Sequence, residues 1–194
     1  MLIEKLKAYN VILGSASPRR KKLLSELGIN FTVKTTQEVE HYPNNIKILE
    51  TAEFLAKQKS NYISEEISDK DLLITVDTIV LQGDKILHKP KNKSEAIITL
   101  ESLSENTHKV ISGVCLRSNK KMVSFSSTTE VSFNKLTRDE IIYYIEKFKP
   151  FDKAGSYGIQ EWIGYIGIKK INGSYNNVVG LPTNELYQKL TLFI

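Results

Sequence analysis

Hydrophobic residues recur along the chain with two periods, one typical of strands and one of helices. A short apolar run at 11–13 predicts a buried strand, and an apolar stripe at three- and four-residue spacing predicts a helix over 18–28. The run at 72–81, LLITVDTIVL, is apolar at almost every position and predicts a strand buried on both faces. Strict alternation over 123–133 predicts a long, half-exposed antiparallel strand instead.

The rest of the pattern interleaves strands and helices with a few hairpins. We expect further strands at 29–33, 85–87, 109–117 and 162–168, further helices at 46–62, 94–103, 137–148 and from 183 onward, and helix N-caps at Ser17, Ser94 and Thr137. This order predicts the α/β class, with a mixed twisted β-sheet flanked by helices. A chain of 194 residues is long enough for one substantial core, so we expect a single domain over 1–194.

Composition narrows the classes of partner. The chain has 27 basic and 22 acidic residues, a net charge of +5, which suits an anionic ligand. The lysines are dispersed and no basic stripe is interleaved with aromatic residues, so nucleic acid is a poor candidate. Cys115 is the only cysteine, so no internal disulfide forms, and its apolar neighbours predict a packed thiol. Neither a signal-peptide core nor a membrane span is visible, and we expect a cytoplasmic protein.

The turn after the first strand is the first candidate for chemistry. Its residues 14–17 are Gly, Ser, Ala and Ser, so a ligand can approach the backbone N–H groups closely. Ser17 and Pro18 are a favourable N-cap and first position of a helix, whose N-terminus attracts anions. Arg19 and Arg20 follow on the first turn, and phosphate is the obvious ligand. An ordinary capped helix with solvated arginines would give the same pattern.

Asp77 is the second candidate, because an ionisable group inside an apolar strand must be paired, neutralised or used. At the end of a strand it would act as a general base or hold Mg²⁺, whereas the structural alternative is a carboxylate that caps a loop. Glu38 and Glu40, in an acidic loop, could complete a site for a hard cation, although loop carboxylates are usually solvated. The three histidines share no spacing, so no histidine metal site is expected.

Two later segments carry polar groups beside turn residues. Lys89 precedes Pro90, which holds the lysine on an extended dipeptide, as a phosphate-directed charge requires. The segment 151–160, FDKAGSYGIQ, ends on Gln160, whose amide offers both the donor and the acceptor that reading a nucleobase edge requires. A plain glycine-rich turn is the alternative for this segment.

Three motifs, in order and spacing, resemble the Maf family of nucleoside triphosphate pyrophosphatases. They are LGSASPRRKKLLSELGINFTV near the N-terminus, TVDTIVLQGDKILHKPKNKSEA in the middle, and DKAGSYGIQ followed by NGSYNNVVGLP. The likeness runs from 11 to about 186, nearly the whole chain. It implies a Maf/ITPase-like fold with two lobes around a nucleotide cleft, and hydrolysis of a nucleoside triphosphate to the monophosphate and pyrophosphate. It also suggests a homodimer, which nothing in the hydrophobic pattern requires.

The resemblance also implies roles for individual residues. Asp77 matches the catalytic acid–base residue, and Glu40 matches an acidic position near a divalent cation, Mg²⁺ or Mn²⁺. The remaining matches are substrate positions: Ser17, Arg19, Arg20, Lys59, Thr78, Lys89 and Gln160. Among them, Arg19, Thr78 and Gln160 match the positions that separate subfamilies, and this combination resembles the branch acting on dTTP and UTP rather than the branch acting on 7-methyl-GTP. Modified pyrimidine nucleotides are further candidate substrates.

The sequence departs from the family pattern at three positions. Gly14 stands where Ala is common, Val76 where a small residue is usual, and His88 where Gly is frequent. None of these removes a charged or hydrogen-bonding group from the expected chemistry. The rival hypothesis is a regulatory nucleotide-binding protein associated with cell division, which would keep the cleft but hydrolyse little.

Overall fold

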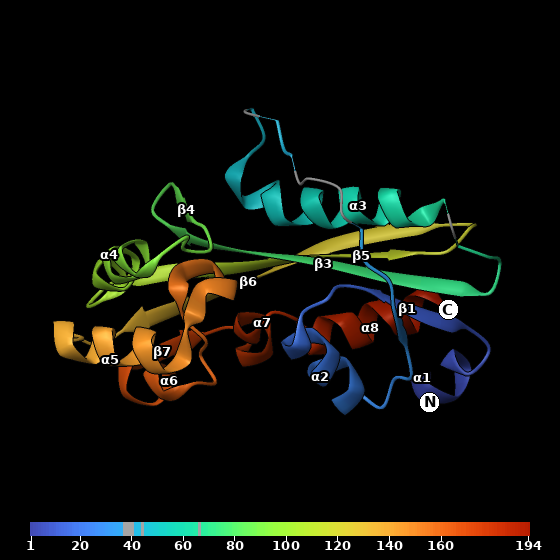
Figure 1. Cartoon of the computed structure of the whole chain (residues 1–194). Coiled ribbons are helices and arrows are strands. Elements are labelled where there is room, and N and C mark those ends of the chain that lie inside the picture. The colour runs from blue at the N-terminus through green and yellow to red at the C-terminus, as the bar shows by residue number, and fades with distance from the viewer. Residues whose placement is uncertain (37–40, 44, 66) are drawn as a thin grey trace. The chain divides into compact units, whose positions relative to one another are not determined.

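The computed structural model describes residues 1–36, 41–43, 45–65 and 67–194 (Figure 1). These residues form two compact units. The first contains Met1–Asp77, Ser112–Ser127 and Gly180–Ile194, and the second contains Thr78–Ile111 and Thr128–Val179. Three long strands contribute residues to both units: β3 (Asp71–Gln82), β5 (Thr107–Arg117) and β6 (Met122–Phe133).

One mixed sheet contains all the strands found in the described residues. Its order is β2 (Thr32–Val33), β1 (Asn10–Gly14), β3, β5, β6 and β7 (Ile168–Asn172), with β4 (Lys85–Leu87) paired to β3. β1 runs parallel to β2 and β3, whereas the β3–β4 and β6–β7 pairs are antiparallel. The predicted mixed α/β class is therefore confirmed. No helix in the described part of the chain is long and apolar enough to cross a bilayer.

In the first unit, helices cover both faces of the strands. α3 (Thr51–Ser64), preceded by the short 3₁₀ helix η1 (Ile48–Glu50), lies on one face, and α1 (Leu2–Leu6), α2 (Pro18–Glu26) and α8 (Thr183–Phe193) lie on the other (Figure 1). This explains why β1 from Val11 onward and the first half of β3 are buried, as the apolar runs predict. Cys115 is buried here and burial raises the pKa of its thiol, which confirms a packed cysteine.

Direct backbone packing fixes α3 against β5. A Cβ on Gly113 would lie 2.2 Å from the carbonyl carbon of Ala52 and 2.2 Å from the nitrogen of Glu53. Only a residue without a side chain permits this approach. The helix that carries Lys59 is thereby held at a fixed height over the strands of its unit.

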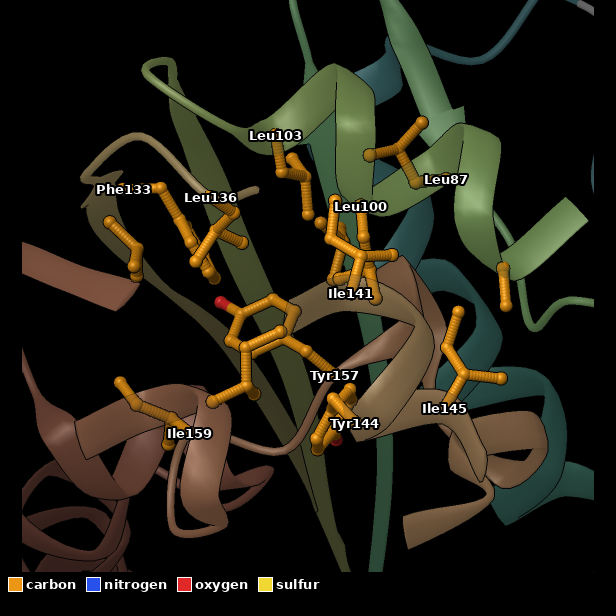
Figure 2. Packing of buried hydrophobic residues seen from close by; sticks show 14 of the residues in the cluster. Leu87, Leu100, Leu103, Phe133, Leu136, Ile141, Tyr144, Ile145, Tyr157 and Ile159 are labelled. Atoms are coloured by element: carbon orange, nitrogen blue, oxygen red, sulfur yellow. The ribbon is translucent and has the colours of Figure 1, made fainter. Parts of the chain in front are cut away.

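In the second unit, one hydrophobic cluster joins α4 (Lys93–Leu103) and α5 (Arg138–Phe148) to the strands. Figure 2 shows Leu100, Ile141, Tyr144 and Tyr157 directed into this cluster. α5 begins with the predicted capping box, in which Thr137 and Glu140 satisfy each other's backbone N–H groups. The short helices that follow α5 in this unit are η2 (Pro150–Asp152), η3 (Ala154–Ser156), α6 (Trp162–Gly167) and α7 (Tyr175–Val179).

Three local predictions were wrong. The apolar run from Trp162 forms α6 rather than a strand, because Ile163 and Gly167, one helical turn apart, are the residues it buries. α4 is capped by Asn92 rather than Ser94, with the Asn92 side chain accepting from the nitrogen of Glu95 at 2.9 Å. The strand predicted at 29–33 shortens to β2.

Candidate active site

The turn between β1 and α2 is ordered by its two serines. Ser17 is the N-cap of α2, and its Oγ accepts from the nitrogen of Arg20 at 3.5 Å, as the sequence predicts. The nitrogen of Ser17 in turn donates to Oγ of the buried Ser15 at 3.3 Å. Gly14 admits the turn so close to β3 that a Cβ would fall 2.5 Å from Cγ2 of Thr75. The turn therefore presents a fixed helix N-terminus, which favours an anionic ligand.

Arg20 ties this turn to two other parts of the first unit. Its Nε donates to the carbonyl of Gly180 at 2.9 Å, just before α8. Its Nη1 donates to Oγ of Ser15 at 3.0 Å and to the carbonyl of Val76 at 3.1 Å. The sequence predicted a phosphate ligand at this position. The structure adds that Arg20 already joins the turn to β3 and to the start of α8.

Asp77 and Lys59 form a largely buried ion pair in the first unit. Lys59 Nζ lies 2.6 Å from Asp77 Oδ1, and the two side chains are 14% and 12% exposed. Lys59 also donates to the carbonyl of Val76 at 3.5 Å, so that it shares this acceptor with Arg20. One carboxylate, one lysine and one arginine thus meet at the strand position that the sequence singled out.

The pairing depends on where α3 is attached. Thr75 Oγ1 donates to the carbonyl of Ala56 at 2.6 Å. Ala56 lies about one helical turn before Lys59 on α3, and Thr75 lies two residues before Asp77 on β3. Ala52, Leu55 and Ala56 form the buried face of α3, and Lys59 follows at its margin. A lysine there extends along the strands while its ammonium reaches the carboxylate.

Two cationic side chains reach the backbone beside Asp77. Arg20 and Lys59 both donate to the carbonyl of Val76, and Lys59 also pairs with Asp77. Cationic groups gathered in this way favour an anionic ligand over a neutral one.

The described residues of this site supply one candidate donor for a divalent cation, the carboxylate of Asp77. No group of three or more His, Cys, Asp or Glu side chains capable of holding a metal occurs among the described residues. Glu40 and Glu38 lie outside them, so the predicted role of Glu40 has no structural counterpart here. Mg²⁺, however, is commonly held by one or two carboxylates plus the phosphates of a substrate. Asp77 supplies one such carboxylate, directly after Val76, whose carbonyl accepts from Arg20 and Lys59.

The second unit carries the other predicted substrate residues. Thr78 is half-buried on β3, and Lys89 is exposed beside the buried Pro90. Gln160 is half-buried, and its Oε1 is a buried acceptor that receives no hydrogen bond from the residues that the structure describes. An acceptor in that state favours a ligand that brings an N–H or O–H donor.

A network missed by the sequence analysis surrounds Gln160. Lys153 Nζ pairs with Asp152 Oδ1 at 2.8 Å and with Glu161 Oε1 at 3.1 Å, although Lys153 is buried. The hydroxyl of Tyr144 contacts Glu161 Oε2. One signal for it was in the sequence: Tyr144 lies on the apolar stripe of α5, and a buried tyrosine hydroxyl requires a partner.

His108 is also buried in this unit, in contact with Tyr157. Its Nε2 lies 2.7 Å from the hydroxyl of Tyr157, and its ring packs edge-on against Tyr157. Burial lowers the pKa of His108 to about 4, so the ring is neutral near pH 7. This is the behaviour of a core histidine.

Comparison with known proteins gives consistent results over nearly the full chain. The family model described as Maf-like protein matches residues 10–193. A dTTP/UTP pyrophosphatase from Parabacteroides distasonis is 48% identical over 99% of this chain and 100% of its own length. A dTTP/UTP pyrophosphatase from Flavobacterium johnsoniae is 43% identical, with all of both chains covered.

Among solved structures, the Staphylococcus aureus Ham1 protein has a similar fold. It superimposes with a TM-score of 0.51 over 95% of this chain and 100% of its own, at 14% identity. At that identity the likeness concerns the fold alone, and it agrees with the ITPase-like architecture that the sequence motifs imply.

Proposed function

The chain belongs to the Maf family, and we propose that it is a dTTP/UTP pyrophosphatase that releases pyrophosphate and the nucleoside monophosphate. The full-length similarity to relatives of that name supports the choice of substrate. The Lys59–Asp77 pair beside the capped turn supports the hydrolytic reaction, because it combines an oriented carboxylate with cations suited to a triphosphate.

Asp77 acts in this proposal as a general base. Lys59 holds Oδ1 at 2.6 Å and so fixes the carboxylate plane, while Oδ2 takes a proton from the attacking water. The water oxygen bonds to the α-phosphorus as the bond between that phosphorus and the α–β bridging oxygen breaks. The bridging oxygen leaves with pyrophosphate, and Asp77 returns its proton to solvent.

In this proposal, charged and polar side chains bind the substrate. Ser17 and the N-terminus of α2 bind phosphate oxygens, and Arg19, Arg20, Lys59 and Lys89 neutralise their charge. Arg20 does so from a position fixed by its bonds to Ser15, Val76 and Gly180. Thr78 and Gln160 supply hydrogen bonds toward the pyrimidine. Positioning and charge stabilisation provide most of the rate, because phosphoryl transfer needs little covalent work from the protein.

A divalent cation, Mg²⁺ or Mn²⁺, belongs to the proposal as well. Asp77 and Glu40 are the residues that would hold it, and when bound it neutralises charge on the phosphate oxygens. We expect hydrolysis to cease after treatment with a chelator and to return on addition of either cation. Full activity in excess chelator would contradict the cation requirement.

We also infer a single functional domain over 1–194 that assembles as a homodimer in the cytoplasm, where free nucleotides are found. Sedimentation at equilibrium tests the assembly, and twice the chain mass of 22.1 kDa is the expected result. A mass equal to one chain would contradict the dimer without affecting the proposed reaction.

The decisive substitution is Asp77→Asn, which keeps the volume of the side chain and removes the base. We expect pyrophosphate release from dTTP and UTP to fall by about 10³-fold, with the far-ultraviolet circular dichroism unchanged. Asp84→Asn, at an exposed turn, is the matched control and should behave as the wild type. Wild-type turnover in the Asp77 variant would exclude the assignment. Absence of turnover in the wild type, with nucleotide still bound, would favour the regulatory alternative.

A further inference from the structure

The carboxylate of Glu161, next to Gln160, is held from two sides. Lys153 Nζ lies 3.1 Å from Oε1, and the Tyr144 hydroxyl contacts Oε2. Both holding groups are buried: Lys153 is 8% exposed and Tyr144 is fully enclosed. Figure 2 shows Tyr144 within the same hydrophobic cluster as Ile159, the residue before Gln160. Gln160 therefore lies between a core residue and a fixed carboxylate.

The Tyr144 hydroxyl also joins the backbone of this loop. It accepts from the nitrogen of Gly158 at 3.0 Å while it donates to Glu161. Burial, reinforced by the charge of Glu161, raises the pKa of Tyr144, so the hydroxyl keeps the proton that it donates. One hydroxyl thus fixes positions 158 and 161 on either side of Gln160.

The Gln160 amide and the Glu161 carboxylate both lie close to Gly158. A Cβ on Gly158 would lie 2.9 Å from Glu161 Oε2 and 3.0 Å from Gln160 Nε2. The amide nitrogen and the carboxylate therefore crowd the same side of Gly158. A carboxylate only accepts hydrogen bonds, so it favours the NH₂ group there and leaves Oε1 as the acceptor without a donor.

We propose that Tyr144, Glu161 and Lys153 form a positioning network that presents Oε1 of Gln160 to the N3–H group of uracil or thymine. Uracil and thymine carry a hydrogen at N3, whereas N3 of cytosine is an acceptor. An oriented acceptor therefore pairs with uracil and thymine. In cytosine it faces a second acceptor at N3, which disfavours that base. Gln160 is half-buried, so part of its side chain is open to a ligand, while the Tyr144 hydroxyl holds the loop through the nitrogen of Gly158. The inference rests on the proposed pyrophosphatase function.

Tyr144→Phe tests the network, because it removes one oxygen and keeps the ring in the core. We expect the ratio of kcat/KM for UTP to that for CTP to fall about tenfold, mainly through a higher KM for UTP. Tyr143→Phe is the matched control: Tyr143 is the adjacent residue, 42% exposed, and its hydroxyl bonds only to Lys147 among the described residues. It should leave the ratio unchanged.

A second substrate makes the outcome specific to N3. In 3-methyl-UTP the N3 hydrogen is replaced, so the wild type should prefer UTP to it by at least about tenfold, and Tyr144→Phe should reduce that preference. Glu161→Gln removes the charge but keeps the volume of the side chain, and it should also reduce the preference for UTP over 3-methyl-UTP. This variant tests the network if Tyr144→Phe does not fold. An equal loss of kcat/KM on UTP, CTP and 3-methyl-UTP would show a merely structural role and overturn the inference. No hydrolysis of UTP by the wild type would instead overturn the proposed function.

Discussion

At the scale of single residues, the contact between Lys59 and Asp77 decides how the strand carboxylate can work. The lysine takes one oxygen at 2.6 Å and is itself bound to the carbonyl of Val76. It is a positioning residue toward the base as well as a cation toward the substrate. Its removal should therefore affect turnover without erasing it, since Asp77 would remain.

We expect Lys59→Ala to lower kcat by about 10- to 100-fold, the range found when a partner that orients a catalytic group is removed. Lys57→Ala is the control, because Lys57 lies on the same helix and pairs with Glu53 at 3.1 Å instead. Steady-state kinetics with UTP give both values. Equal kcat values for the two variants would contradict the role of Lys59.

Substitutions of the adjacent residues Arg19 and Arg20 should have different effects. Arg20→Ala removes three bonds within the first unit, at Ser15, Val76 and Gly180, and should lower the free energy of unfolding by about 2 kcal/mol. Arg19→Ala should instead change the order of preference among nucleotides, because Arg19 matches a position that separates subfamilies. Urea unfolding and a nucleotide panel measure the two effects. A uniform loss on every nucleotide for Arg19→Ala would reduce it to a phosphate contact.

His108 gives the protein a pH dependence of stability. Its folded-state pKa of about 4 lies below its ordinary value of 6.5, so the unfolded chain binds a proton that the folded chain excludes. The stability from this group is complete above pH 6.5 and is lost as the pH falls toward 4. Between pH 7 and pH 5 it amounts to about 2 kcal/mol.

His108→Gln should make the loss of stability between pH 7 and pH 5 smaller than in the wild type by that amount, as measured by urea unfolding at both pH values. His88→Gln, at an exposed position, is the control and should keep the wild-type dependence. Identical pH dependence in His108→Gln and the wild type would contradict a buried, neutral ring.

At the scale of elements, the contact between α3 and β5 holds Lys59 over its strand. A methyl group at position 113 would overlap the backbone of Ala52 and Glu53, which cannot move aside as a side chain can. We expect Gly113→Ala to lower the free energy of unfolding by about 3 kcal/mol or more and to reduce activity with it. Gly83→Ala, where a Cβ meets nothing within 4 Å, should cost about 1 kcal/mol through its positive φ of 56°. Equal unfolding midpoints for the two variants would contradict the close packing.

Elements defined by local chemistry could be predicted from the sequence. The Ser17 cap, the Thr137–Glu140 capping box and the largely apolar β3 follow from patterns of a few residues. α6 could not be predicted in this way, since its run of apolar residues and glycines is compatible with both a strand and a helix. There the packing decides: a Cβ on Gly164 would meet the carbonyl of Ile159 at 1.8 Å, a closeness set by the fold of the loop.

The same limit applies to the site. Asp77 could be singled out because a charge interrupts an apolar strand, and Gln160 because its amide ends a glycine-containing polar segment, whereas Lys59 came from the family resemblance alone. The partners of these residues could not be found, because Lys59 lies 18 residues from Asp77 and Tyr144 lies 17 residues from Glu161. Only folding brings them together, and the sequence patterns report neighbours along a helix or strand.

At the scale of the whole molecule, the two units carry different parts of the proposed chemistry. The first contains the capped turn, Arg20 and the Lys59–Asp77 pair, which suit phosphate and hydrolysis. The second contains Gln160 and the network around it, which suit recognition of a base. Substitutions of Lys59 and Asp77 should therefore lower turnover on every nucleotide, whereas substitutions around Gln160 should change selectivity.

The central claim is that water attacks the α-phosphorus of UTP or dTTP. Hydrolysis of UTP in water enriched in oxygen-18, followed by mass spectrometry of the products, tests it directly. The account predicts UMP carrying one oxygen-18 atom together with unlabelled pyrophosphate. Labelled pyrophosphate, or UDP with labelled inorganic phosphate, would contradict it.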